Sequence, residues 1–458
     1  MTKSWFGSAA RLGARYGNGD ADPVEVVEQA LVHIAIADRA IFTLVTADRA
    51  RAEALASRQR QRAGKRRGVL DGVPIAWKDL FGLAGITTTA GSRALPERPE
   101  PRDADIVAQM VAAGLVSVGR VNMSEFAFSG LGLNSIFGTP GNAADPQRIP
   151  GGSSSGSAVA VASGIVPLSI GTDTGGSVRI PAALNGVVGY KATAGRYSTA
   201  GVFPLSPALD SLGVLCKTVD DAILADTAMR GATDSQRQPV GLRGLRIVAP
   251  TNVVLDSCSD SVMANFEDAL TKLGRAGASI ERARLPAFDA ILEIIAKRGA
   301  LVNADAYAIH RERLDGPAAM MMDRRVVSRA RLGARTSPAD RQAITEARRA
   351  LSRETAARLD GAAVAFPTTA VTAPKIAALE ADDDAFFRVN ALMLRNTMLG
   401  NFLNWCGVSL PNGCDSDGMP TGLLLSAPGG FDEWLLALTQ TVHSLIDDLA
   451  EPLTPVVK

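Results

Sequence analysis

The segment 151–181, GGSSSGSAVAVASGIVPLSIGTDTGGSVRIP, constrains the fold of this chain more than any other part of the sequence. Two glycine-rich turns flank a run of small residues, which predicts a helix over 157–164, and an apolar run, which predicts a buried strand over 166–170. Glycine permits positive φ and lets the backbone approach a ligand closely, so both turns could present amide N–H groups inward. Two such turns separated by one helix and one strand are unusual for turns that only reverse the chain.

Two nucleotide-binding interpretations of these glycines fail on the residues themselves. A phosphate loop needs Lys and then Ser or Thr after its last glycine, but Gly156 is followed by Ser157 and Ala158. The dinucleotide fingerprint fails as well, because Gly130-Leu-Gly132-Leu-Asn-Ser135 lacks the final glycine.

Short apolar strands alternate with helices elsewhere in the chain, which predicts an α/β protein with helices on the faces of a sheet. The predicted strands are 73–77, 116–120, 362–366, 408–411 and 422–425, and the predicted helices are 24–37, 47–63 and 104–113. Residues 298–360 are rich in Arg and Ala and predict a helical excursion, resembling a cap, in the C-terminal half. Because strands return after it, we expect one domain over 1–458, with two N-terminal helices in 1–70 and a catalytic core in 71–215.

Charge and composition exclude several classes of function. The 48 basic and 47 acidic residues leave a net charge of +1, which gives no general reason to bind nucleic acid or an anionic membrane. No window is long and apolar enough for a transmembrane helix, and polar residues and glycines interrupt Met1–Gly17, so we expect a cytoplasmic protein. With 3 histidines and 4 scattered cysteines, we expect reduced thiols, no Ser-His-Asp triad, no metal site and no cofactor.

Two parts of the sequence are similar to the signature of the amidase signature hydrolases. Residues 151–181 resemble the glycine-serine signature of that family, and Gly72-Val-Pro-Ile-Ala-Trp-Lys78-Asp79 resembles its lysine segment. The resemblance covers 71–215 and extends loosely through Phe366-Pro-Thr-Thr and 407–425. It implies the amidase-signature fold, a mixed β-sheet core covered by helices on both faces. Stand-alone bacterial amidases and the A-type glutaminase branch of the amidotransferases share these motifs.

The resemblance also implies a Ser-cis-Ser-Lys triad. Ser177 would be the nucleophile, Ser153 the bridging serine after a cis peptide bond, and Lys78 the base. The backbone N–H groups of the second turn would form the oxyanion hole: Thr174, Gly175, Gly176 and Ser177. Supporting roles fall to Ser154, Asp173 and Arg179, although the last two could also be an ordinary structural ion pair.

The chemistry of the residues agrees with this assignment. A serine hydroxyl needs a base, and without a well-placed histidine an unprotonated amine is the remaining candidate. Burial lowers the pKa of a lysine by several units, and Lys78 follows the apolar run 73–77. The alternative is a solvated lysine on the surface, paired with Asp79.

The sequence says less about the substrate pocket. Phe126, Phe128, Ser129 and Gly130 are candidates for its wall, although Phe126 and Phe128 could belong to the core instead. Met320, Met321 and Met322 are either adaptable pocket lining or gap filling. Leu394, Arg395 and Trp405 lie near the segment where glutamine-using relatives keep an acidic residue for the amino group of the substrate. An apolar or basic residue there disfavours glutamine.

Three hypotheses of different class follow. The first is a free-standing amidase that cleaves a small carboxamide to a carboxylate and ammonia or an amine through a Ser177 acyl-enzyme. The second is the glutaminase subunit of a tRNA-dependent amidotransferase, and the third is a non-catalytic relative, which the intact triad disfavours. The expected binding partner is a small amide substrate. A homodimer is possible, and the sequence does not decide the oligomeric state.

Overall fold

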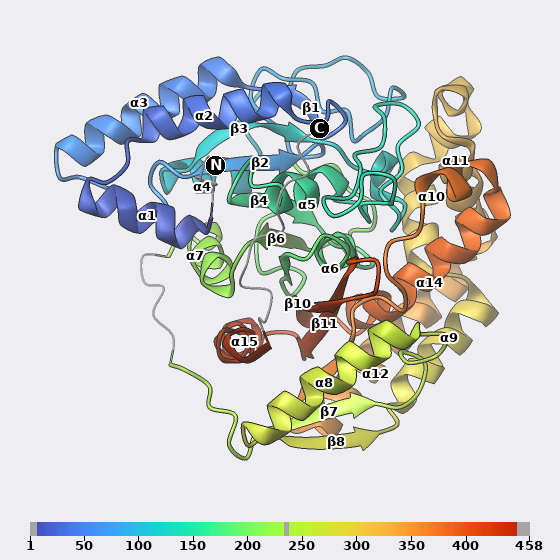
Figure 1. Ribbon diagram of the computed structural model, residues 1–458. Helices are drawn as coiled ribbons and strands as arrows, with labels where there is room; N and C mark the ends of the chain where they lie inside the picture. Colours follow the sequence, from blue (N-terminus) through green and yellow to red (C-terminus); the bar gives the residue numbers. More distant parts are fainter. Residues whose placement is uncertain (1–6, 233–237, 447–458) are drawn as a thin grey trace.

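The computed structural model describes residues 7–232 and 238–446. Eleven strands among these residues form one mixed sheet (Figure 1). In sheet order the strands are β1 (Phe42–Val45), β3 (Val116–Val121), β2 (Pro74–Lys78), β4 (Leu168–Thr172), β6 (Leu212–Cys216), β5 (Val188–Lys191), β10 (Cys406–Cys414), β11 (Pro420–Ala427), β9 (Ala363–Pro367), β7 (Arg246–Pro250) and β8 (Ser279–Ala283). β2 runs parallel to β3 and β4, whereas β5, β6, β10 and β11 pair antiparallel with their neighbours. The predicted α/β class is confirmed.

The helices are α1 (Ala9–Asn18), α2 (Pro23–Ile36), α3 (Ala47–Arg62), α4 (Asp105–Ala112), η1 (Glu125–Ala127), α5 (Ser155–Ala162), α6 (Arg179–Leu184), α7 (Val219–Met229), α8 (Asp260–Arg275), α9 (Pro286–Arg298), α10 (Leu301–Asp315), η2 (Pro317–Met321), α11 (Arg324–Arg331), η3 (Leu332–Arg335), α12 (Pro338–Leu359), α13 (Ile376–Ala381), α14 (Asp383–Phe402) and α15 (Asp432–Ile446). Within the described residues no helix is long and apolar enough to cross a membrane.

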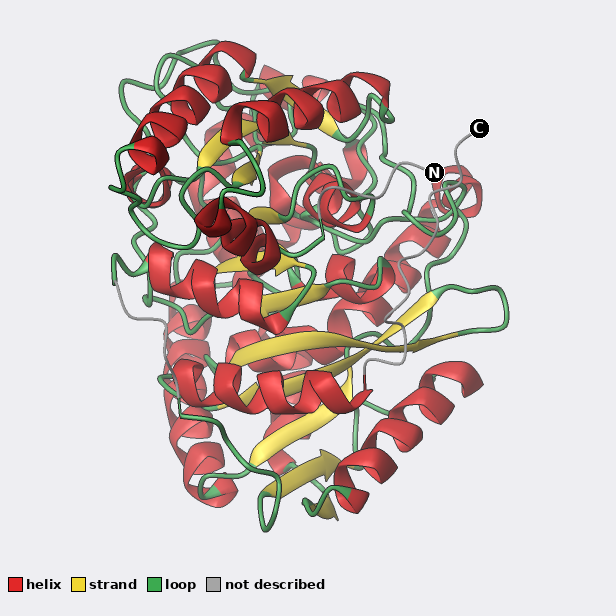
Figure 2. Cartoon of the chain, turned by 60° about the vertical axis from the view of Figure 1, so that its left-hand side comes forward, coloured by secondary structure: helices red, strands yellow, loops and turns green. Residues whose placement is uncertain are grey.

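Helices cover both faces of the sheet, as Figure 2 shows. Neighbouring residues of β5 identify the two faces, because successive side chains of a strand point to opposite sides. A Cβ at Gly189 would meet Ala182 of α6, whereas the Tyr190 hydroxyl donates a hydrogen bond to Asp432 of α15. α5 and α6 therefore lie on one face, and α15 with its neighbours α7 and α8 lies on the other.

The N-terminal region differs from the sequence prediction. Besides α2 and α3, it contains the strand β1 and the helix α1, which is capped by Ser8 at its N-terminus and by Gly19 at its C-terminus. Two glycines inside α1 hide it from sequence, because glycine disfavours a helix interior. Gly13 is required by packing, since a Cβ there would collide with the backbone of Val69.

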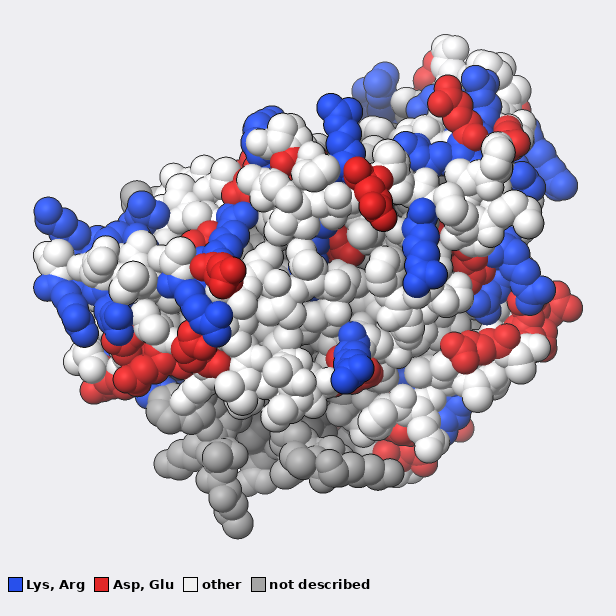
Figure 3. All heavy atoms as spheres, turned by 90° about the horizontal axis from the view of Figure 1, so that it is seen from above, with Lys and Arg blue, Asp and Glu red and all other residues white. Residues whose placement is uncertain are grey.

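The helical excursion lies where the sequence predicts it. Residues 298–360 are all described and contain only helices and connections between β8 and β9, mainly α10, α11 and α12. The chain then returns to the sheet, and β10 and β11 fill the gap between β5 and β9. On the face seen in Figure 3, basic and acidic side chains are interspersed.

Candidate active site

The strands β2 and β4 carry residues of the site at their C-terminal ends, which lie at the same edge of the sheet. β2 and β4 are parallel neighbours, and Lys78 and Thr172 are their last residues. From there Lys78 Nζ donates hydrogen bonds to Ser153 Oγ at 2.7 Å and to Thr172 Oγ1 at 2.9 Å. The parallel pairing thus places Lys78 beside Thr172, and the Lys78 side chain reaches Ser153 in the turn before α5.

Lys78 is fully buried and forms no ion pair with a described carboxylate. Burial lowers its pKa from 10.5 to about 7, although Asp173 and Asp210 act in the opposite direction. The surface alternative is wrong, because Asp79 instead pairs with buried Arg120 at 3.2 Å and accepts a hydrogen bond from Thr89. A substantial fraction of such a lysine is neutral near pH 7 and able to accept a proton.

The first glycine turn carries the expected cis peptide bond between Gly152 and Ser153. The Ser153 carbonyl accepts a hydrogen bond from the Ser124 amide at 3.0 Å. Next along the chain, the Ser154 amide donates to the Ser177 carbonyl at 3.2 Å. The two turns that the sequence singled out are therefore joined directly, and Ser177 lies beside Ser153 and Ser154.

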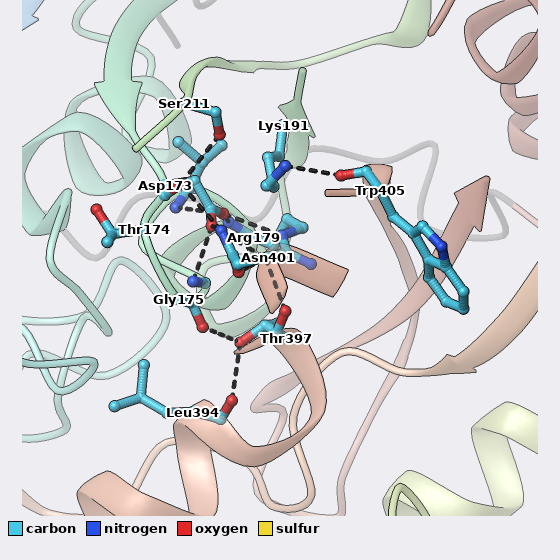
Figure 4. Close-up of polar contacts among 12 residues, drawn as sticks. Asp173, Thr174, Gly175, Arg179, Lys191, Ser211, Leu394, Thr397, Asn401 and Trp405 are labelled. Atoms are coloured by element: carbon cyan, nitrogen blue, oxygen red, sulfur yellow. Dashed lines mark hydrogen bonds and ion pairs between the residues drawn. The ribbon is translucent and has the colours of Figure 1, made fainter. Parts of the chain in front are cut away.

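A buried ion pair holds the second turn (Figure 4). Arg179 donates to both carboxylate oxygens of Asp173, at 2.9 and 3.0 Å, and Asn401 of α14 donates to Asp173 at 2.9 Å. Burial opposes ionisation of Asp173, but Arg179 and these hydrogen bonds hold its pKa well below the usual range. The network fixes the turn from both its own segment and α14.

Gly176 departs from the predicted oxyanion hole. Its N–H donates to Asp173 Oδ1 at 2.8 Å, so this donor is already engaged. No hydrogen bond within residues 7–232 and 238–446 uses the N–H groups of Thr174, Gly175 or Ser177. Three of the four predicted donors thus have no hydrogen-bond partner among the described residues, whereas the N–H of Gly176 is engaged within the turn.

Gly176 cannot be another residue without local rearrangement. Its φ is +138°, and a Cβ would collide with Thr397 of α14. Thr397 Oγ1 also donates to the Gly175 carbonyl at 2.6 Å. This bond ties the carbonyl side of the turn to α14.

A cavity of about 80 Å³ adjoins the turn. It is lined by Ala127, Phe128, Ser129, Thr174, Gly175, Ser177, Leu205, Leu209, Ile291, Ile295, Ala300, Leu301, Val302, Arg329, Leu394, Met398 and Phe402. The walls are mostly apolar and come from the core, from α9 to α11 and from α14. Because one water needs roughly 10–15 Å³, the cavity has room for a small acyl group.

A second cavity, of about 490 Å³, shares Ala127 and Leu205 with the first. Thr172 and Asp210 line the second cavity and not the first. The second cavity therefore approaches Lys78 from the side of Thr172.

Two of the four residues proposed for the pocket wall line the first cavity, namely Phe128 and Ser129. Phe126 lies in the core instead, where its ring stacks on Phe203 and His310 at 5.2 and 5.0 Å between ring centroids. Gly130 faces Leu394, which fills the space in front of it.

The residues named in the C-terminal half have different surroundings. Leu394 lines the cavity, whereas Arg395 points away and donates to the carbonyls of Val254 and Asp256. Trp405 packs on Phe288 in a separate core cluster. Met320 and Met321 are exposed and Met322 is buried, and none of the three lines the cavity.

Sequence reasoning missed several residues of the site. Thr172, Arg329, Thr397 and Asn401 all touch its elements, but no motif marks them. Thr172 could have been found as the last residue of a strand before the second turn. The other three are far from the signature in sequence and come next to it only in the fold.

Comparisons with known proteins agree with the site. The Amidase family model matches residues 25–436. The chain is 34% identical over 453 residues to a 2-amino-5-chloromuconic acid deaminase from Comamonas testosteroni, covering 96% of each chain. It is 43% identical over 277 residues to the A-type subunit of a glutamyl-tRNA(Gln) amidotransferase from Anaeromyxobacter dehalogenans, covering 57% of this chain and 56% of that one.

A solved amidase structure has a TM-score of 0.86 and 31% sequence identity, and the match covers 96% of this chain and all of that one. The fold and the site together are those of an amidase-type hydrolase. The chain belongs to the amidase family.

Proposed function

We propose that this protein is an amidase that cleaves a small carboxamide to a carboxylate and ammonia or an amine through a Ser177 acyl-enzyme. The observation that carries the proposal is the buried Lys78, whose Nζ lies 2.7 Å from Ser153 Oγ without a carboxylate partner among the described residues. A neutral amine in this place can draw a proton from Ser177 through the Ser153 hydroxyl.

In this scheme Ser177 Oγ attacks the amide carbon, and its proton passes through Ser153 to Lys78. The free N–H groups of the turn stabilise the oxyanion of the tetrahedral intermediate. The proton on Lys78 then returns through Ser153 to the leaving nitrogen, and water hydrolyses the ester. The pKa of about 7 for Lys78 supports both steps, because the group can take up and release a proton near neutral pH.

The second candidate is the glutaminase subunit of an amidotransferase, favoured by the identity to the A-type amidotransferase proteins. That identity covers little more than half of either chain, whereas the match to the deaminase covers 96% of both. None of the residues that line the first cavity is Asp or Glu, so the ammonium group of glutamine would have no counter-ion there. The cavity therefore supports a free-standing amidase.

Ammonia release from the purified chain tests the proposal. The panel contains aliphatic amides, aryl amides and glutamine, each assayed without any partner protein. We expect hydrolysis of at least one simple amide, and hydroxylamine should convert the acyl-enzyme to a hydroxamate. Turnover of glutamine alone would support the second candidate, and an active Ser177→Ala variant would refute the acyl-enzyme.

A further inference from the structure

Arg329 of α11 is the one charged residue among those that line the first cavity. Its guanidinium lies over the Phe128 ring, 4.4 Å from the centroid, and Nη1 donates to the Phe128 carbonyl at 2.8 Å. Both contacts fix Arg329 to the loop that leads to Ser129. The cation is therefore held at a defined place in the cavity wall.

This arginine has no carboxylate partner among the described residues, and burial lowers its pKa to about 10, so it stays charged at neutral pH. Arg325, one turn earlier on the same helix, makes a matching contact, because its guanidinium lies 4.5 Å from the centroid of Phe386. Arg325 also pairs with Asp323 at 3.0 Å. Arg329 is only partly buried, yet its positive charge has no counter-ion among the described residues, in contrast to that of Arg325.

The remaining donors of Arg329 are free. No hydrogen bond to a described residue uses Nε or Nη2. A guanidinium edge with free N–H groups matches the two oxygens of a carboxylate. The nearby walls, which include Ile291, Ile295 and Leu301, are hydrocarbon and suit an apolar spacer.

We propose that Arg329 binds a carboxylate of the substrate, so that the amide hydrolysed at Ser177 carries a second, acidic end joined by a short apolar spacer. This inference rests on the proposed function and narrows it to the amides of dicarboxylic acids. None of the lining residues is Asp or Glu, so the ammonium group of an amino acid amide would have no counter-ion there, and such a substrate fits less well.

The test compares two series of amides of matched length. One series is HOOC–(CH₂)n–CONH₂ with one to four methylene groups, and the other ends in a methyl group instead of the carboxylate. Ammonia release gives kcat/KM for each pair. We expect the best acid to exceed its neutral partner by about 10- to 100-fold, the range for a hydrogen-bonded ion pair.

Variants of the two arginines assign the preference. Arg329→Gln should remove the preference for acids mainly through KM, and Arg329→Lys should keep part of it. Arg325→Gln, which removes a stacked arginine outside the cavity, should leave the preference unchanged. Titration calorimetry of succinamate with Ser177→Ala should show binding that disappears in Ser177→Ala/Arg329→Gln.

The outcomes separate the two proposals. Equal kcat/KM for acids and neutral amides, with no selective effect of Arg329→Gln, would overturn the carboxylate site and leave the amidase proposal standing. If no amide is hydrolysed, the amidase proposal fails and calorimetry decides the carboxylate site alone. Succinamate binding that is absent or indifferent to Arg329→Gln would then refute that site.

Discussion

Lys78 Nζ lies 2.7 Å from Ser153 Oγ in a fully buried position. Burial is the dominant cause of the low pKa of this lysine, about 7. Below that pH Lys78 is protonated and cannot accept the proton of Ser177, and above it the amine is neutral. We therefore expect kcat/KM to rise with pH through about 7 and to level off on the alkaline side. A pH–rate profile that is flat between about pH 5 and 9 would contradict this assignment.

Substitution of Lys78 separates a base from a structural cation. Lys78→Arg keeps the charge, but guanidinium stays protonated at every accessible pH, so we expect no measurable activity. Lys78→Ala should be about as inactive. Steady-state rates with circular dichroism as a check on folding make the comparison, and near-native activity of the arginine variant would exclude Lys78 as the base.

Ser177→Ala should fold normally and lose at least about 10³-fold in kcat, because the nucleophile is gone. Ser155→Ala is the matched control, since Ser155 is also buried beside the first turn but its hydroxyl has no hydrogen-bond partner among the described residues. The control should keep near-native activity. Loss of activity in the Ser155 variant with retention in the Ser177 variant would reverse the assignment.

Asp173 should matter for stability as well as for the shape of the turn. Asp173→Ala leaves Arg179 buried without a counter-ion, and we expect a loss of about 3–5 kcal/mol in the free energy of unfolding. Glu267→Ala breaks the exposed pair with Arg282 and should cost less than about 1 kcal/mol. Urea denaturation measures both. Similar losses for the two variants would show that the Asp173 pair is not important for stability.

Titration of the buried Glu125 carboxyl should make the stability of the fold depend on pH. Its carboxylate accepts hydrogen bonds from Ser92 Oγ and from the Asp323 amide, but burial raises its pKa from 4.5 to about 7. The folded state therefore binds the proton more tightly than the unfolded state, and this contribution to stability is lost as pH rises from about 4.5 to 7.

Glu125→Gln does not titrate and keeps the shape of the side chain. Relative to wild type, the variant should therefore gain on the order of 1–3 kcal/mol in unfolding free energy between about pH 5 and pH 8. Urea denaturation at the two pH values measures this change. An unchanged difference between variant and wild type would show that Glu125 is not titrating in this range.

Local sequence patterns, namely a helix start signal and apolar runs, explain why so much of the fold could be predicted. The Asp22-Pro23 pair predicts a helix start, and α2 begins there with the Asp22 side chain accepting from the Val24 amide. Apolar runs likewise predict β2, β3, β4 and β9 within two residues of their bounds. Helix α1 escaped prediction because Gly13, one of its two interior glycines, is required by a tertiary contact with Val69, which no local pattern encodes.

The residues of the candidate site also fall into two groups, those that local motifs predict and those that only the fold brings together. The glycine-serine turns and the lysine segment are continuous motifs, so Lys78, Ser153 and Ser177 could be proposed from sequence. The hydrogen bond from the Gly176 amide to Asp173 depends on the rotamer of the Asp173 side chain, so it could not be predicted from sequence. Asn401 and Arg329 act across more than a hundred residues of chain, and only the assembled fold brings them to the turns.

The position of β10 and β11 in the sheet has a consequence for biosynthesis. These strands are the last to be translated, yet they join β5 to β9 in the middle of the sheet. A nascent chain therefore carries two incomplete pieces, β1 to β6 and β7 to β9, whose open edges at β5 and β9 stay unpaired until residue 427 has emerged from the ribosome. Unpaired strand edges of this kind promote aggregation. Premature termination of translation before residue 427 would therefore yield an aggregation-prone fragment instead of a hydrolase with reduced activity.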